Sequence, residues 1–134
     1  MIASLTDLSD SSVWSNVSVT IGTIAESSID GQGNTNAIIA QQGQTTSAAL
    51  LCHNYTGGGF NDWYLPAIWE LNQCNNAAFV VNNILGTTNG FRYTYYWSST
   101  EGKGNYAGTY YFNGGYTDNY GKGNTFSVRA VRRF

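Results

Sequence analysis

The sequence is poor in charged residues, and basic side chains are missing from most of it. Only 10 % of its 134 residues are Asp, Glu, Lys or Arg, against about 25 % in an average globular protein. Residues 1–91 contain six carboxylates and no Lys or Arg, so their formal charge is −6. All six basic residues lie in residues 92–134, where two carboxylates leave a formal charge of +4. A basic segment in an acidic chain indicates an electric field suited to an anionic partner, unless the clustering is chance.

Other absences exclude classes of protein. No run approaches the roughly 20 apolar residues that span a bilayer, so we expect no membrane insertion. One histidine, His53, and two cysteines cannot supply a four-ligand zinc site, and we expect no metal or other cofactor. His53 and Cys52 are neighbours on a predicted helix and point about 100° apart, which argues against a catalytic pair. No nucleophile elbow or phosphate-binding loop occurs, so we expect no enzyme.

The length fits one domain with its own core. We assign residues 1–134 to a single domain, in which residues 1–19 are an N-terminal extension or first strand. With so few charges, solubility must come from uncharged polar residues and glycine, namely Asn, Ser, Thr, Gln and Gly. Such a surface is common in secreted proteins and in proteins that contact sugars. The even cysteine count favours a disulfide between Cys52 and Cys74, worth roughly 3 kcal/mol. Two buried free thiols are the alternative.

Two helices are predicted in the middle of the chain. Hydroxyl side chains at 45–47 precede an apolar stretch, which predicts a helix over about 46–54 that ends before the glycines at 57–59. Pro66 suits the first turn of a second helix over about 67–74, where apolar residues recur on one face. Elsewhere in residues 1–91 we expect an extended segment over 12–25, a loop over 30–34, and a strand or helix over 37–40.

From Phe91 onward, aromatic runs alternate with glycine- and asparagine-rich turns, which predicts short antiparallel strands. The runs cover 91–97, 109–112 and 126–131. Alternation in the last run predicts Val128 in the core and Arg129 on the outside.

The tetrapeptide Gly-Lys-Gly-Asn occurs at 102–105 and again at 121–124. We expect both copies to be exposed turns with Lys103 and Lys122 at their tips. The lysines then either contact a ligand or only keep the turns soluble and unpaired.

We predict a ligand-binding surface made of basic side chains and tyrosines. Arginine forks match sulfate, lysine acts as a point charge, and an exposed tyrosine offers an apolar face with a polar tip. The predicted ligand-binding residues are Arg92, Lys103, Tyr106, Tyr120, Lys122, Arg129, Arg132 and Arg133. Alternatively, the C-terminal arginines pair with Asp62, Glu101 or Asp118 inside the fold, and Arg129 is the strongest candidate for such a role.

Three motifs occur in order along the chain: NDWYLPAIWELN at 61–72, YWSSTE at 96–101 and VRAVRRF at 128–134. Upstream of them stand Asn34-Thr35 and Ala48-Ala49 followed by Cys52. Together these residues resemble the Lcl C-terminal domain family, the distal domain of Legionella collagen-like adhesins and related bacterial surface proteins. The resemblance spans about residues 20–134.

The resemblance implies an α+β, C-type-lectin-like fold, with two short helices packed on short antiparallel strands and long Gly- and Asn-rich loops. It implies a homotrimer on a collagen-like stalk that binds sulfated glycosaminoglycans or other polyanionic glycans. We therefore expect an extracellular, non-enzymatic adhesion domain, either on a bacterial cell surface or secreted, without a nucleic-acid partner. No Glu-Pro-Asn or Gln-Pro-Asp triplet is present, so calcium-mediated sugar binding is not expected. The alternative function is a structural trimerisation or protein-binding module.

Overall fold

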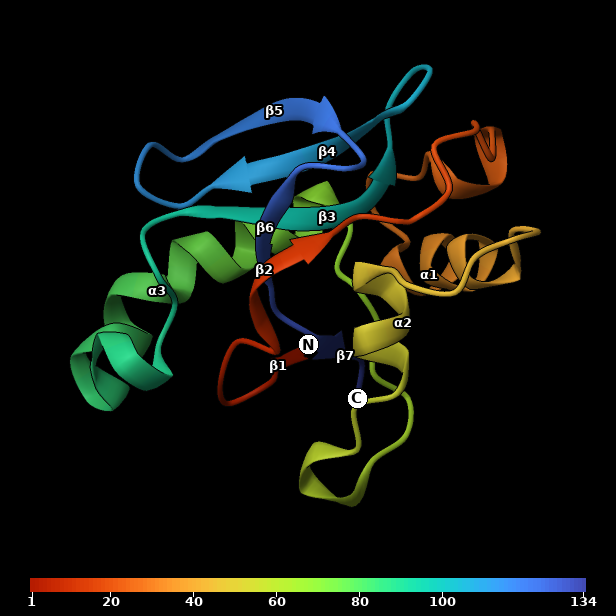
Figure 1. Ribbon diagram of the computed structural model, residues 1–134. Helices are drawn as coiled ribbons and strands as arrows, with labels where there is room; N and C mark the ends of the chain where they lie inside the picture. The colour runs from red at the N-terminus through yellow and green to blue at the C-terminus, as the bar shows by residue number, and fades with distance from the viewer.

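A computed structural model describes residues 1–86 and 88–134 of the chain (Figure 1). Its larger sheet has the strand order β2-β6-β3-β4-β5 and is antiparallel except where β3 pairs with β6. A smaller sheet pairs β1 with β7, which brings the two chain ends side by side. The strands are β1 (Ile2–Ala3), β2 (Ser9–Val13), β3 (Tyr95–Glu101), β4 (Tyr106–Tyr111), β5 (Tyr116–Gly121), β6 (Thr125–Val128) and β7 (Val131–Arg132).

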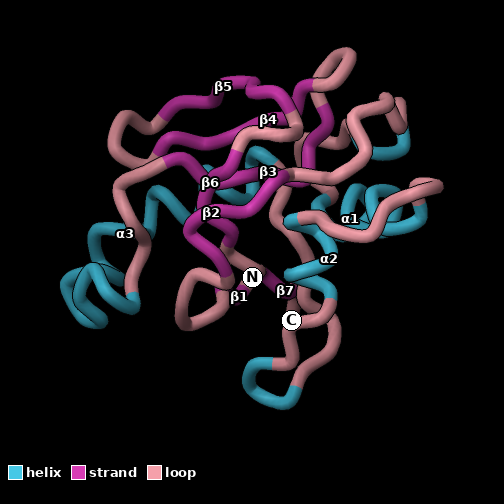
Figure 2. Tube along the Cα trace, viewed as in Figure 1, coloured by secondary structure: helices cyan, strands magenta, loops and turns pink.

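The helices lie to either side of the larger sheet. In the view of Figure 2, α3 runs along the left and lower side, and α1 and α2 lie on the right. They are α1 (Gly31–Ala40), α2 (Ala48–His53) and α3 (Ile68–Asn89), with short 3₁₀ turns at Thr23–Ala25 and Gly57–Gly59. Helices beside mostly antiparallel strands confirm the predicted α+β class. The C-type-lectin-like assignment stays a prediction.

The two predicted helices are confirmed, and the second is longer than expected. The Ser47 side chain accepts a hydrogen bond from the Leu50 amide and caps α2. At the start of α3, the Glu70 carboxylate accepts from the Ala67 amide at 2.9 Å. The helix then continues far beyond residue 74 to a kink at Gly86, where φ is 71°, and a last turn follows to Asn89.

Two expectations for the first 40 residues are wrong. Residues 31–34 are the first turn of α1, because the Asp30 carboxylate caps the helix by accepting from the Gly33 amide at 3.1 Å. The run at 37–40 completes this helix. The extended segment 12–25 becomes strand only through Val13, then a single bridge between Ser15 and Ser47 and a 3₁₀ turn.

The aromatic strands form largely where predicted, but β5 was missed and Arg129 was misplaced. The sequence of β5, YTDNYG, resembles a turn because Asp, Asn and Gly are common in turns. The segment is a strand because it pairs with β4, and local propensity does not predict it. Strand β6 ends at Val128, so the alternation that put Arg129 outside stops one residue earlier. Val128 is buried as predicted, and Arg129 is buried too.

The core consists of two clusters, and they separate the cysteines. Trp14, Trp97 and Cys52 belong to one cluster, while Tyr96 and Cys74 belong to the other. Both thiols are free and buried, so the predicted disulfide is wrong and the alternative of two buried thiols holds. The physical reason is that α2 and α3 each turn their cysteine into a different part of the core.

Candidate functional site

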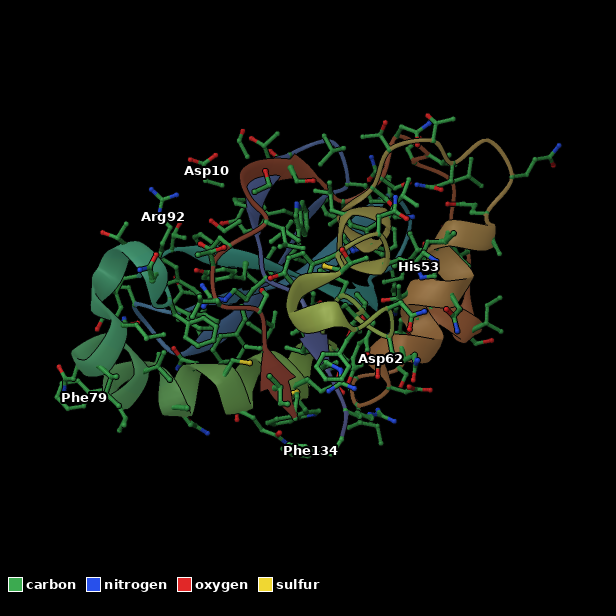
Figure 3. All side chains as sticks on the ribbon, turned by 90° about the horizontal axis from the view of Figure 1, so that it is seen from below. Asp10, His53, Asp62, Phe79, Arg92 and Phe134 are labelled. Carbon is green, nitrogen blue, oxygen red and sulfur yellow. The ribbon has the colours of Figure 1, made fainter. Side chains whose placement is uncertain are left out.

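The basic side chains are distributed over the molecule and mostly paired with carboxylates. Among the described residues, Lys103 is the one basic side chain that makes no ion pair. Arg92 and Lys103 lie at opposite ends of β3, roughly 20 Å apart for a strand of this length. In Figure 3, Arg92 with Asp10 is on one side of the molecule and Asp62, the partner of Arg132, is on the other. A single basic patch on one chain is therefore not formed by these residues.

Lys122 is buried, so the prediction of an exposed tip is wrong for the second Gly-Lys-Gly-Asn copy. Only 1 % of its surface is exposed, and its Nζ donates to the Glu101 carboxylate and to the Val19 carbonyl at 3.0 Å. The same carboxylate accepts from the amides of Ile21 and Gly22, at 2.8 and 2.7 Å. Lys122 and Glu101 thus fasten the chain around residues 19–22 to the sheet, where a soluble ligand cannot reach them.

Arg129 is the second buried basic side chain. Its guanidinium donates to the Asp7 carboxylate at 2.9 Å and to the carbonyls of Leu5 and Gly90 at 2.8 Å each. It also lies 4.5 Å from the Phe91 ring centroid. Burial raises the pKa of Asp7 above its ordinary value, although the hydrogen bonds from Arg129 and Tyr96 act to lower it. The internal role considered for Arg129 is confirmed, with a partner that the sequence did not indicate.

Arg132 forms a two-point ion pair with Asp62, one of the partners considered from the sequence. Its Nε and Nη2 donate to the two carboxylate oxygens at 2.6 and 2.8 Å, and its guanidinium lies 3.7 Å from the Phe60 ring centroid. These hydrogen bonds lower the pKa of Asp62 and raise the pKa of Arg132. Arg132 is therefore mostly occupied inside the fold.

Arg133 is half-exposed and makes longer contacts. Its Nη2 lies 3.4 Å from the Glu70 carboxylate and 3.5 Å from that of Asp30. The pair with Asp30 is exposed on both sides and contributes little, about 0–1 kcal/mol, whereas the Glu70 carboxylate is buried.

The structure brings two predicted binding residues together at the turn between β3 and β4. Lys103 and Tyr106 line a pocket of about 400 Å³ with Gly102 and Asn119. Lys103 is exposed, and Tyr106 is 51 % exposed. Asn119 was not predicted, because it lies on β5, the strand that the sequence did not reveal. Tyr120 is not part of this pocket.

Tyr120 instead packs in an aromatic cluster on the opposite face of the sheet. It is partly buried, and its ring centroid lies 4.9 Å from that of Phe126 and 5.3 Å from that of Tyr95. The strand alternation that separates it from Asn119 explains why neighbouring residues face different surroundings.

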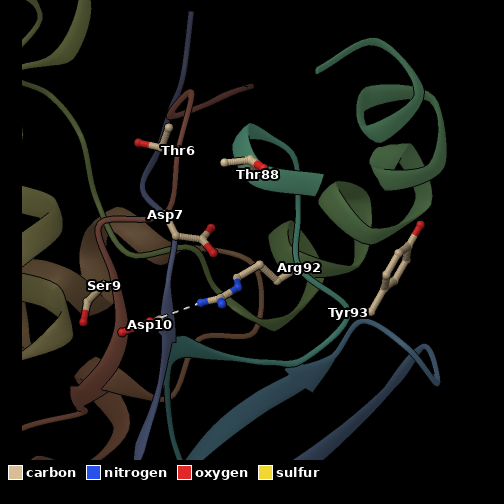
Figure 4. Close-up of a pocket in the computed structure, with 7 residues that line it drawn as sticks. All are labelled: Thr6, Asp7, Ser9, Asp10, Thr88, Arg92 and Tyr93. Carbon is tan, nitrogen blue, oxygen red and sulfur yellow. Dashed lines mark hydrogen bonds and ion pairs between the residues drawn. The ribbon is translucent and has the colours of Figure 1, made fainter. Parts of the chain in front are cut away.

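Arg92 lines a second, larger hollow, drawn in Figure 4. This groove has a volume of about 580 Å³ and lies between residues 6–10 and residues 88–93. The Arg92 Nη1 atom is 3.3 Å from the Asp10 carboxylate, and both side chains are exposed.

A comparison with protein-family models assigns the chain to a family. The model described as Lcl C-terminal domain matches residues 3–132, nearly the whole length. The chain belongs to the Lcl C-terminal domain family. This confirms the resemblance seen in the sequence and makes the chain an adhesin-associated domain. No curated protein matches this Lcl C-terminal domain.

The surface of this Lcl C-terminal domain carries two candidate contact sites, the Lys103 pocket and the Arg92 groove. Within residues 1–86 and 88–134, no three His, Cys, Asp or Glu side chains are grouped so as to hold a metal ion. Over the same residues, no helix is both long and apolar enough to cross a membrane. What the surface offers is one unpaired cation beside an exposed tyrosine, and one groove with an arginine and a carboxylate at its mouth.

Proposed function

We propose that this Lcl C-terminal domain is an extracellular, non-enzymatic adhesion domain that binds sulfated glycosaminoglycans or related polyanionic glycans. The observation behind the proposal is Lys103, an exposed cation that makes no ion pair among the described residues and shares a pocket with Tyr106 and Asn119. A lysine ammonium attracts a sulfate as a point charge. The exposed ring of Tyr106 offers an apolar face to a sugar ring, and the Asn119 amide offers a donor and an acceptor.

Binding by this route depends on assembly. Arg92 and Arg133 are already in ion pairs with carboxylates, and Lys122 and Arg129 are buried. One chain thus offers few contacts to a polyanion. A homotrimer, which family membership favours, repeats the Lys103 pocket three times, and a repeating polyanion then binds with avidity.

The test is heparin affinity over a salt series, with the oligomeric state measured at the same protein concentration. Each engaged cation contributes about −0.7 to −0.9 to the slope of log affinity against log salt, by analogy with nucleic acids. A trimer that uses three copies of Lys103 should therefore lose about two units of slope in the Lys103→Gln variant. Arg133→Gln is the control, because it removes the same charge outside the pocket and should change the slope less. Unchanged heparin affinity of Lys103→Gln, or affinity independent of salt, would contradict the proposal.

A structural or protein-binding module is the second candidate, and the ion pairs favour it. Arg129 and Arg132 serve the fold through Asp7 and Asp62 rather than facing a ligand. A glycan array at low salt separates the two functions. Silence towards every sulfated ligand, with a folded protein of known oligomeric state, would favour the protein-binding module.

A further inference from the structure

The groove beside Arg92 has walls that are held in place before any ligand arrives. Buried Arg129 joins them, since it donates to the Leu5 carbonyl behind one wall and to the Gly90 carbonyl behind the other, at 2.8 Å each. A second link runs through Tyr96, whose hydroxyl accepts from the Arg92 amide at 2.8 Å and donates to the Asp7 carboxylate at 2.9 Å. A site fixed in this way loses little conformational entropy on binding.

The charges at the groove cancel. Asp7 is neutralised from beneath by Arg129 at 2.9 Å. At the mouth, Asp10 and Arg92 have side chains that are 69 % and 52 % exposed and lie 3.3 Å apart. A sulfate that approaches Arg92 also meets the Asp10 carboxylate, and a cation at Asp10 meets the Arg92 guanidinium. The groove therefore favours a ligand without net charge.

The hydrogen-bonding groups suit a molecule with hydroxyls on neighbouring carbons. A hydroxyl both donates and accepts, so one hydroxyl can donate to Asp10 while the next accepts from Arg92, in charge-assisted hydrogen bonds. Thr6 and Thr88 add hydroxyls from opposite walls (Figure 4). Tyr93, 51 % exposed, stands on the far side of Arg92 and offers an apolar ring with a polar tip.

We propose that this groove binds an uncharged sugar ring, with Asp10 and Arg92 shared between two adjacent hydroxyls. The volume of about 580 Å³ lies within the range of roughly 300–1,000 Å³ typical of small-ligand sites. The groove is at the opposite end of β3 from Lys103, so it is separate from the polyanion contact and does not depend on it.

The experiment is an NMR titration of the ¹⁵N-labelled chain with methyl glycosides of glucose, galactose, mannose and fucose. We expect at least one to give saturable shifts in residues 6–10 and 88–93, with a Kd on the order of 1 mM. Because the ligand is uncharged, added salt should leave this Kd unchanged. Asp10→Asn and Arg92→Gln should each weaken binding by about tenfold, the usual effect of losing a hydrogen bond to a charged group.

Matched controls separate this site from the Lys103 pocket. Asp118→Asn and Lys103→Gln each change one exposed charge outside the groove and should leave the Kd of the glycoside unchanged. Asp10 and Arg92 are exposed, so their variants should keep the wild-type spectrum elsewhere. The proposal is overturned if no glycoside shifts the groove, if both groove variants bind as the wild type does, or if a heparin disaccharide binds there while uncharged glycosides do not.

Discussion

Two lysines in identical Gly-Lys-Gly-Asn sequences have opposite environments. Lys103 is exposed at the turn between β3 and β4, while Lys122 follows β5 and turns inward to the Glu101 carboxylate. Its Nζ also lies 4.8 Å from the Trp14 ring centroid. Taking two charges out of water is costly, and the cost is recovered only while both partners are present and hydrogen-bonded. Local sequence does not distinguish a ligand contact from a core residue here.

This contrast gives a matched pair of stability predictions. Lys122→Met leaves the Glu101 carboxylate buried without its cation, and should lower the free energy of unfolding by about 3–5 kcal/mol. Lys103→Met removes the same side chain from the same tetrapeptide, at the surface, and should change it by less than about 0.5 kcal/mol. Urea denaturation of both variants measures the difference. Equal losses would show that the two lysines have similar surroundings.

The cysteines allow a second prediction about single residues. Burial raises the pKa of Cys74 to about 12 and raises the pKa of Cys52 as well. Since the thiolate is the reactive form, neither cysteine should react with a thiol reagent at about pH 8 in the native protein. Both should react after unfolding in urea without a reductant. Mass spectrometry counts the labels. If the unfolded protein needs a reductant before it can be labelled, the two cysteines are bonded after all.

At the scale of elements, the first turns of α1 and α3 meet at a point that only glycine fits. The Glu70 carboxylate accepts from the Gly31 amide at 3.2 Å as well as from Ala67, so one side chain caps both helices. A Cβ at Gly31 would lie 2.7 Å from the Ala67 nitrogen and 2.7 Å from the Leu65 carbonyl oxygen. The Glu70 carboxylate that caps both helices would lie closer still, and the backbone atoms cannot move aside as a side chain can.

Gly31→Ala should therefore separate the two helix starts and destabilise the fold by about 1–3 kcal/mol, as overpacking does. Gly123→Ala is the control, because a Cβ there meets nothing within 4 Å. Thermal unfolding followed by circular dichroism compares the two variants. A Gly31→Ala protein as stable as Gly123→Ala would show that the α1–α3 contact is looser than described.

At the scale of the whole molecule, arginines fasten both ends of the chain. Arg129 holds the segment around Leu5 and Asp7, and Arg132 holds the C-terminal strand β7 to Asp62. Two loops distant in sequence thus depend on carboxylates whose ionisation changes with pH. The two carboxylates act in opposite directions, because folding lowers the pKa of Asp62 and raises that of Asp7.

The sign of each contribution follows from proton linkage. The stabilisation from Asp62 is complete above its ordinary pKa of 3.8 and is lost as the pH falls through the lower pKa of the folded state. Asp7 acts in the opposite sense, because its pKa is raised in the folded state. Its contribution to stability is present below pH 3.8 and is lost as the pH rises through the raised pKa. Asp62→Asn should thus be less stable than the wild type near neutral pH, and the difference should shrink as the pH falls below 3.8. Urea midpoints across this range test it, and a constant difference would exclude the Asp62 ion pair as its source.

The sequence by itself determined the class of fold, the family, and the residues with a strong local signature. Hydroxyl caps and apolar spacing placed α2 and the start of α3, and aromatic runs placed most strands, because these signals act over a few neighbouring residues. Ordered motifs along the whole chain are sufficient to identify the family.

Only the tertiary structure decided which charges are available and where strands continue. Whether a lysine or arginine binds a ligand depends on whether a carboxylate distant in sequence lies beside it, as Glu101 does for Lys122 and Asp7 for Arg129. Strand β5 formed because β4 supplied its hydrogen-bond partners, and with it came Asn119 in the Lys103 pocket. The groove at Arg92 has the same origin, since its walls come from the two halves of the chain and meet through Arg129. Contacts of this kind carry no local pattern, because their energy comes from residues that the chain brings together only on folding.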